Sequence, residues 1–196
     1  MEDSQMELQH INVKLFLRNP ELVDLEPLVP VFHSWIQDQK PEELLIDVAD
    51  YRHVEAGPGV MLIGHEGNYS VDNTDGRLGV RYNRKAALAG SNQDRLKQAA
   101  RSAITACQRL ESEPRLGGKI GFDGQTVEIS VNDRLLAPNN GASREALKLD
   151  FEQFAQNLFR GSEYSLAYEN DSRKLFAVTV KAAKTFFAAD LLERLS

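Results

Sequence analysis

Apolar and polar residues alternate over residues 11–17, near the start of the chain. Ile11, Val13, Leu15 and Leu17 recur at every second position, which is typical of a β-strand with one buried face. The same criterion, together with the turn-forming residues between segments, predicts seven further strands. They are expected at residues 43–48, 60–66, 78–84, 119–122, 126–131, 164–169 and 174–181.

Apolar residues at intervals of three and four predict four amphipathic helices. The longest is expected at about residues 92–111, where Ser91 can cap the first turn and Asp94 can complete a capping box. The other three are expected at about residues 25–36, 144–159 and 185–195, the last with Phe187 on its buried side.

The connections between the predicted strands favour antiparallel pairing. Asp123-Gly124 stands between two short apolar runs, which is a strong signal for a two-residue hairpin turn. The predicted order of elements is βαβββα, then ββα, then ββα. This order predicts an α+β fold, in which about four helices pack against a mainly antiparallel sheet of about eight strands built of hairpins.

The length of the chain favours one compact domain. It has 196 residues, 42% of them hydrophobic, which is enough to fill a core without disulfides. Residues 1–113 are expected to form an N-terminal β-rich half with two helices, and residues 119–196 a C-terminal ββαββα half. The recurring hairpin-and-helix unit leaves two readings open, an internal repeat or the chance recurrence of a common unit.

The net charge and the lack of targeting signals narrow the function classes. The formal net charge of −6 argues against nucleic acid as a partner, because binding the phosphate backbone needs a cationic face. The first ten residues lack the basic and apolar regions of a secretory signal, and no apolar run approaches the roughly 20 residues that cross a bilayer. We therefore expect a cytoplasmic protein that does not enter a membrane.

The sequence lacks the common motifs for cofactors and nucleophilic catalysis. With Cys107 as its single cysteine, the chain can form neither an internal disulfide nor a thiolate zinc cluster, and the position of Cys107 in a helix predicts a buried thiol. A phosphate-binding loop, a dinucleotide-binding loop and a nucleophile elbow are all missing. No cofactor is therefore expected.

One group of residues could carry metal chemistry. Asp47, Asp50, His53, His65 and Glu66 lie on two neighbouring predicted strands and beside the turn between them. If they converge at one end of the sheet, they could bind zinc, manganese or iron, with His53, His65 and Glu66 as the metal ligands. This arrangement would indicate a metal-assisted hydrolase or isomerase-like enzyme. The simpler explanation is a solvated strand face for the carboxylates and a hydrogen-bonded core position for His65.

Charge is unevenly distributed along the chain. Residues 1–57 carry twelve acidic and four basic residues, whereas residues 77–85 carry four basic residues and no acidic one. The alternation of a strand places Arg77, Arg81 and Lys85 on one face, where they could bind an anion. Alternatively, this row pairs internally with the acidic N-terminal third.

The leading hypothesis is a cytoplasmic, non-catalytic binding or regulatory protein of unknown specific function. It would use the basic strand face to bind a small anionic ligand or a protein partner. The metal-assisted enzyme is the alternative hypothesis.

Overall fold

One sheet and four α-helices form most of the chain, of which the computed structural model describes residues 6–38 and 43–196. The strands are β1 Ile11–Leu17, β2 Leu45–Tyr51, β3 Gly59–Gly64, β4 Gly67–Asp72, β5 Gly79–Arg84, β6 Phe122–Val131, β7 Tyr164–Tyr168 and β8 Phe176–Ala182. The α-helices are α1 Leu28–Asp38, α2 Asn92–Glu111, α3 Gly141–Leu158 and α4 Ala188–Arg194, and short 3₁₀ turns are η1 Pro20–Leu22, η2 Thr74–Gly76 and η3 Pro114–Leu116.

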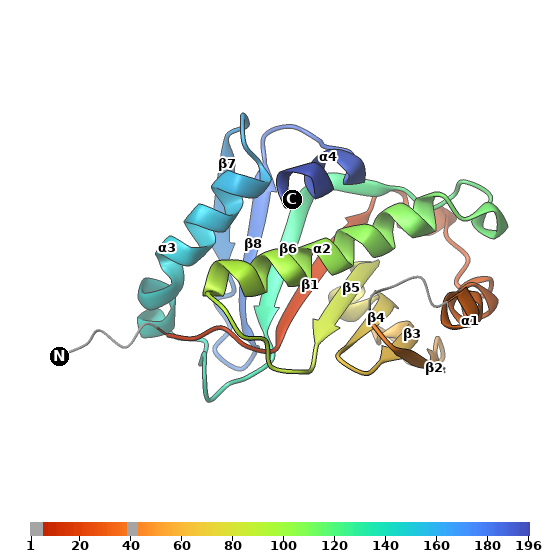
Figure 1. Cartoon of the computed structure of the whole chain (residues 1–196), viewed down its shortest axis with the longest axis horizontal. Coiled ribbons are helices and arrows are strands. Elements are labelled where there is room, and N and C mark those ends of the chain that lie inside the picture. Colours follow the sequence, from red (N-terminus) through yellow and green to blue (C-terminus); the bar gives the residue numbers. More distant parts are fainter. Residues whose placement is uncertain (1–5, 39–42) are drawn as a thin grey trace.

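Strand β1 lies inside a fully antiparallel sheet of order β2-β3-β4-β5-β1-β6-β8-β7 (Figure 1). It pairs with β5 on one side and with β6 on the other, so a single sheet runs through both predicted halves of the chain. The antiparallel α+β class predicted from the sequence is therefore confirmed. All seven residues of β1 are buried, including those that alternate with its apolar positions.

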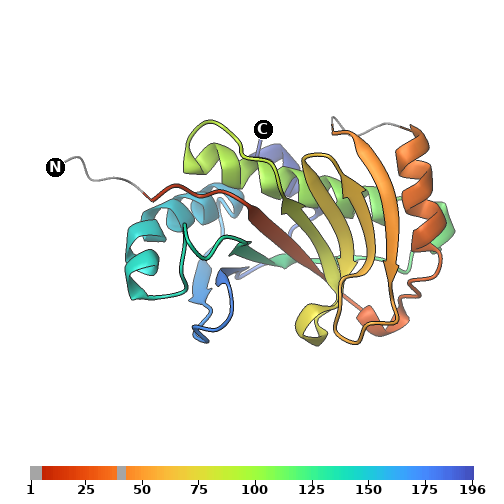
Figure 2. The ribbon, with the colours of Figure 1, turned by 90° about the horizontal axis from the view of Figure 1, so that it is seen from below.

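The helices pack against one face of the sheet, as the turned view shows (Figure 2). Helix α2 crosses β1 and β5, α1 packs on β2 and β3, α3 contacts β7, and α4 packs on α2. We call the opposite face, which carries no α-helix among the described residues, the open face. None of the helices in the described residues is long and apolar enough to span a membrane.

Helix α2 forms where the periodicity predicts it, at Asn92–Glu111. The Ser91 hydroxyl accepts the N–H of Asp94, and the Asp94 carboxylate accepts the N–H of Ser91, which is the predicted capping box. Cys107 is completely buried, and burial raises the pKa of its thiol well above the usual range. The prediction of a buried thiol is thus confirmed.

The predicted hairpin at Asp123-Gly124 is wrong, because Phe122 and residues 126–131 belong to the single strand β6, while residues 119–121 lie in no strand. The Asp123 carboxylate accepts the N–H groups of Gln125 and Thr126, and Gly124 has a positive φ of 59°. The pairing with β1 jumps here from Leu15–Val127 to Leu17–Phe122. The turn residues therefore make a bulge, after which the strand continues in the same direction.

The segment before α4 docks onto this bulge. The N–H of Phe186 donates to the Gly124 carbonyl at 3.0 Å, and a Cβ at position 124 would lie 1.8 Å from the Phe186 carbonyl oxygen. Phe186 is buried beside Phe159, whereas Phe187 is 74% exposed. The prediction that Phe187 faces the core is therefore wrong by one residue.

Strand β4 was not predicted, because Gly67-Asn68-Tyr69-Ser70-Val71-Asp72 is rich in residues that are rare in strands. It nevertheless has the correct alternation, with Tyr69 and Val71 buried towards the helices. The true order is β1, α1, β2 to β5, α2, β6, α3, β7, β8 and α4. The predicted total of eight strands holds because one strand was missed and one was split.

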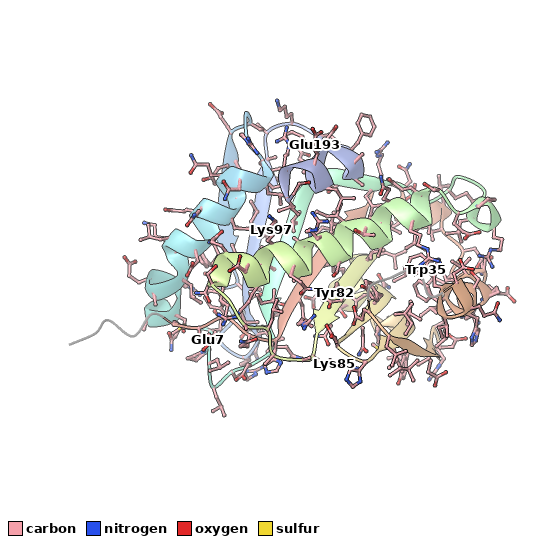
Figure 3. The ribbon with its side chains drawn as sticks, viewed as in Figure 1. Glu7, Trp35, Tyr82, Lys85, Lys97 and Glu193 are labelled. Carbon is pink, nitrogen blue, oxygen red and sulfur yellow. The ribbon has the colours of Figure 1, made fainter. Side chains whose placement is uncertain are left out.

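A carboxyl group is enclosed with two tyrosines beneath the helices. Tyr69 and Tyr82 donate to one oxygen of Glu43 at 3.1 and 3.5 Å. Gln98 of α2 donates to the Tyr82 hydroxyl at 3.3 Å, and Tyr82 lies against this helix (Figure 3). Burial raises the pKa of Glu43 above its ordinary value of 4.5, and the Tyr69 hydrogen bond opposes this change only in part.

Replacing Glu43 with Gln should make the protein more stable than the wild type at neutral pH. The raised pKa means that the folded wild type loses stability as pH rises from 4.5 through the folded-state pKa, and glutamine does not ionise. The difference in unfolding free energy should therefore be small below pH 4.5 and grow above it. Urea unfolding over a pH series measures this difference, and a gap that is independent of pH would contradict the expectation.

Candidate functional site

The structure places Asp50 and His53 of the predicted metal group at one end of the β2–β3 hairpin, and His65 and Glu66 beyond the other end. In the β2–β3 hairpin Asp50 pairs with Val60, and His65 follows Val60 by five residues, so the two lie about 16 Å apart along the strand. His53 and His65 are both exposed, which also excludes the core position suggested for His65. Among the residues that the structure describes, no three His, Cys, Asp or Glu side chains lie close enough to hold a metal ion.

The carboxylates of this group instead bind groups next to them. Asp47 accepts the N–H of Val48 at 2.8 Å, and Asp50 accepts the N–H and guanidinium of Arg52, which lowers the pKa of Asp50 to about 2. Both carboxylates are thus occupied by donors one or two residues along the chain. Glu66 forms an ion pair with Arg84 at 2.8 Å.

Of the three predicted anion-binding residues, the structure brings two together. Arg77 and Arg81 both line a pocket of about 680 Å³ on the open face. Lys85 follows the end of β5 and donates to the Gly64 carbonyl at 2.6 Å, outside this pocket. The predicted row is therefore broken where the strand ends.

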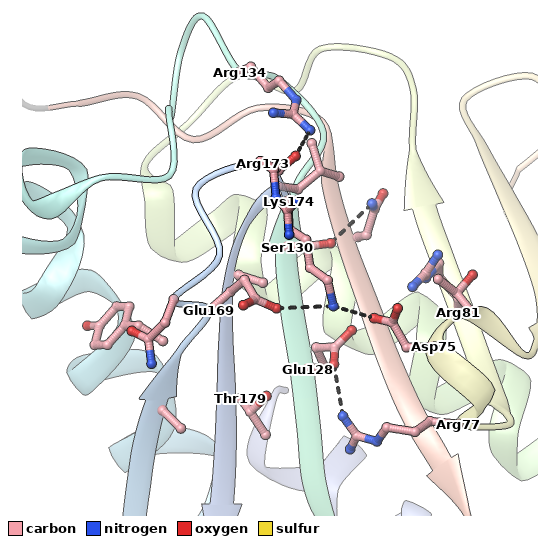
Figure 4. Close-up of a pocket in the computed structure, with 17 residues that line it drawn as sticks. Asp75, Arg77, Arg81, Glu128, Ser130, Arg134, Glu169, Arg173, Lys174 and Thr179 are labelled. Atoms are coloured by element: carbon pink, nitrogen blue, oxygen red, sulfur yellow. Dashed lines mark hydrogen bonds and ion pairs between the residues drawn. The ribbon is translucent and has the colours of Figure 1, made fainter. Parts of the chain in front are cut away.

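The pocket lies between two loops that rise from the open face (Figure 4). Its floor is formed by β1, β6, β8 and the end of β7, with Ser130 and Thr179 among the floor residues. One wall is the η2 turn with Asp75, and the other is the β7–β8 loop with Lys174. Lys174 reaches across to Asp75 at 3.1 Å and also lies 3.5 Å from Glu169.

Basic side chains outnumber acidic ones in this pocket. Five basic residues line it, against three acidic ones. The basic residues are Arg77, Arg81, Arg134, Arg173 and Lys174, and the acidic residues are Asp75, Glu128 and Glu169. The described residues that line the pocket thus have a surplus of two positive charges in a chain whose net charge is −6, and two of them, Arg81 and Arg173, also pair with Asp72 and Asp171 beside the lining.

A buried ion pair supports the pocket beside its floor. Lys14 and Asp72 are 2% and 1% exposed, and their charged groups are 2.6 Å apart. Burial lowers the pKa of Lys14, and the Asp72 carboxylate opposes this change. Asp72 also accepts from the hydroxyl and N–H of Thr74 and from Arg81, so every one of its neighbours in this cluster is a donor.

Gly79 leaves the space for this ion pair. Strand β5 lies between β1, which carries Lys14, and β4, which carries Asp72. Gly79 pairs with Asp72, and a Cβ at this position would lie 3.2 Å from the Lys14 side chain and 2.3 Å from the Leu15 carbonyl oxygen. The missing side chain lets Lys14 extend over β5 to its partner.

Two arginines of the pocket are positioned by their surroundings. The Arg77 guanidinium lies 3.7 Å from the centre of the Phe16 ring and forms a 3.3 Å ion pair with Glu128. Arg81 forms a 3.2 Å ion pair with Asp72, while its buried Nε has no hydrogen-bond partner. An N–H that is buried without a partner is costly, and an anionic oxygen would satisfy it.

Arg77 and Arg81 of the predicted basic row thus do form internal ion pairs, but not with the acidic N-terminal third of the chain. Asp72 and Glu128, which pair with Arg81 and Arg77, both lie outside residues 1–57. An amide ladder completes the open face, in which Asn83 donates to Asn12 and Asn12 donates to Ser130. Alternation along β1 and β6 already placed these polar residues opposite the core, although sequence analysis did not select them.

Replacing Lys14 with Met should destabilise the protein by about 3 kcal/mol, because it leaves the buried Asp72 carboxylate without its closest cation. Adding Asp72→Asn to that variant should recover part of the loss, since the uncompensated charge is removed. Urea unfolding measures both effects. A loss below about 1 kcal/mol for Lys14→Met would instead equal that of an exposed ion pair and contradict the role assigned here.

Comparison of the chain with protein-family models, curated proteins and solved structures finds no match. A function for this chain therefore rests on the chemistry of its own side chains.

Proposed function

We propose that this chain is a cytoplasmic, non-catalytic binding protein that holds a small anionic ligand, with phosphate or carboxylate groups, in the open-face pocket. The observation that carries the proposal is the surplus of positive charge in a concave site of an acidic protein. Opposite charge in a cleft raises the local concentration of an anion and speeds its association.

The arrangement of the side chains supports an anion as the ligand. Arg81 has a buried Nε without a partner, and the Arg77 guanidinium lies over the Phe16 ring and pairs with Glu128. Guanidinium groups bind carboxylates and phosphates through paired hydrogen bonds, which are strong because the acceptor is charged. An entering anion would add acceptors to both arginines.

The shape of the pocket favours a small ligand over a macromolecule. Its volume of about 680 Å³ is within the usual range for small-molecule sites, and the Lys174–Asp75 ion pair joins its two walls. Both partners of that ion pair are about half exposed, so it contributes little stability and can open when a ligand enters. The separation of His53, in the β2–β3 turn, from His65 and Glu66 beyond the other end of β3 gives no support to the metal-assisted alternative.

Isothermal titration calorimetry with pyrophosphate and with citrate tests this proposal and distinguishes the two anionic groups. Arg81→Gln should weaken binding of the preferred probe by about tenfold, the usual effect of losing a hydrogen bond between charged groups. Binding should also weaken as salt rises, because ions screen exposed charges.

Lys85→Gln is the matched control, since it removes the same charge from the same segment but outside the pocket. It should leave the affinity unchanged. Failure of both probes to bind, or an equal loss of affinity in the two variants, would contradict a specific site for small anions.

A further inference from the structure

A second cleft lies between α1 and α2, on the helical side of the sheet. Its volume is about 420 Å³, and it is lined by Trp35 of α1, by Tyr69 of β4 and by the side chains on one face of α2. Figure 3 shows Trp35 in the gap between α1 and the C-terminal part of α2. The cleft is separated from the open-face pocket by the sheet, so the two sites are independent.

The described walls of the cleft combine the edges of two aromatic rings with one cation. Trp35, Tyr69 and Ala106 form its apolar base, where 3%, 7% and 4% of their surfaces are exposed, and Ser102 and Thr105 add hydroxyl groups. Among the described residues that line it, Arg109 is the one basic residue. Small-molecule sites are typically apolar cavities of this size with few polar groups, which fix the orientation of the ligand.

Arg109 is positioned to receive an anionic group. Its guanidinium lies 4.1 Å from the centre of the Trp35 ring, and it forms a 3.2 Å hydrogen-bonded ion pair with Asp38. The Asp38 side chain is 43% exposed, so water screens this ion pair and a second carboxylate can compete for the guanidinium. Stacking on Trp35 keeps the guanidinium in place during such an exchange.

We propose that this cleft binds a flat, apolar small molecule with one anionic group, of the aromatic carboxylate class. The apolar body would lie against Trp35 and Tyr69, and the carboxylate would bind Arg109. This ligand class differs from the small polar anions of the open-face pocket, because the described residues of the second cleft offer an apolar base and one cation.

The cleft contains its own optical probe, since Trp35 is the only tryptophan of the chain. Titration with 2-naphthoate should change the Trp35 fluorescence and reach saturation. The neutral alcohol of the same shape, 2-naphthylmethanol, should bind the wild type more weakly than 2-naphthoate does.

Two charge-removing variants on α2 test whether the Arg109 guanidinium itself binds the carboxylate. Arg109→Gln should weaken 2-naphthoate binding by about tenfold and remove its advantage over the alcohol, because a charge-assisted hydrogen bond is lost. Arg101→Gln is the matched control, because Arg101 lies on the same helix but donates to the Leu195 carbonyl and does not line the cleft. The affinity of this variant for 2-naphthoate should match that of the wild type.

A third variant tests the location of the site without changing charge. Ala106→Leu should fill the cleft and block both probes, while circular dichroism checks that the helices are retained. No saturable fluorescence change in the wild type, or an equal effect of Arg109→Gln and Arg101→Gln, would overturn the proposal. Because pyrophosphate and citrate address the other face of the sheet, failure here would leave the result for the open-face pocket unchanged.

Discussion

The buried Lys14–Asp72 ion pair is the interaction on which the open face depends. Strand β1 is enclosed on both faces, so a lysine at its centre is tolerated only with a partner that offsets the cost of burial. That partner lies two strands away, and Gly79 provides the path between them. Asp72 in turn holds Thr74, so the η2 turn that forms one wall of the pocket is attached to the centre of the sheet.

Features encoded by neighbouring residues were predicted well, and features that depend on distant partners were not. The Ser91 capping box and the alternation in β1 are local signals, and both agree with the structure. Asp123-Gly124 is compatible with a hairpin and with a bulge, and only the pairing of β6 with β1 decides between them. Alternation placed Arg77 and Arg81 on one face, and both line the pocket, but Lys174 is 99 residues from its partner Asp75, a contact that no spacing along the chain could predict.

The two proposed sites share one arrangement on opposite faces of the sheet. In each, an arginine lies over an aromatic ring and also pairs with a carboxylate. Arg77 lies over Phe16 and pairs with Glu128, and Arg109 lies over Trp35 and pairs with Asp38. The ring fixes the plane of the guanidinium, which reduces the side-chain entropy lost when a ligand binds. The surroundings differ, because eight charged residues line the open-face pocket, whereas Arg109 is the one charged residue among the described residues that line the cleft. This difference in surroundings is the basis for assigning two ligand classes.

The inner position of β1 has a consequence for how the chain folds during synthesis. Asn12 contacts Asn83 and Ser130, which follow it by 71 and 118 residues. At typical rates of translation, about 4 to 14 seconds pass before the ribosome has added the residues of β5, and longer before it has added those of β6. Strand β1 therefore waits longer for its second neighbour than any later strand of the sheet, and in that time its unpaired edge is open to wrong partners.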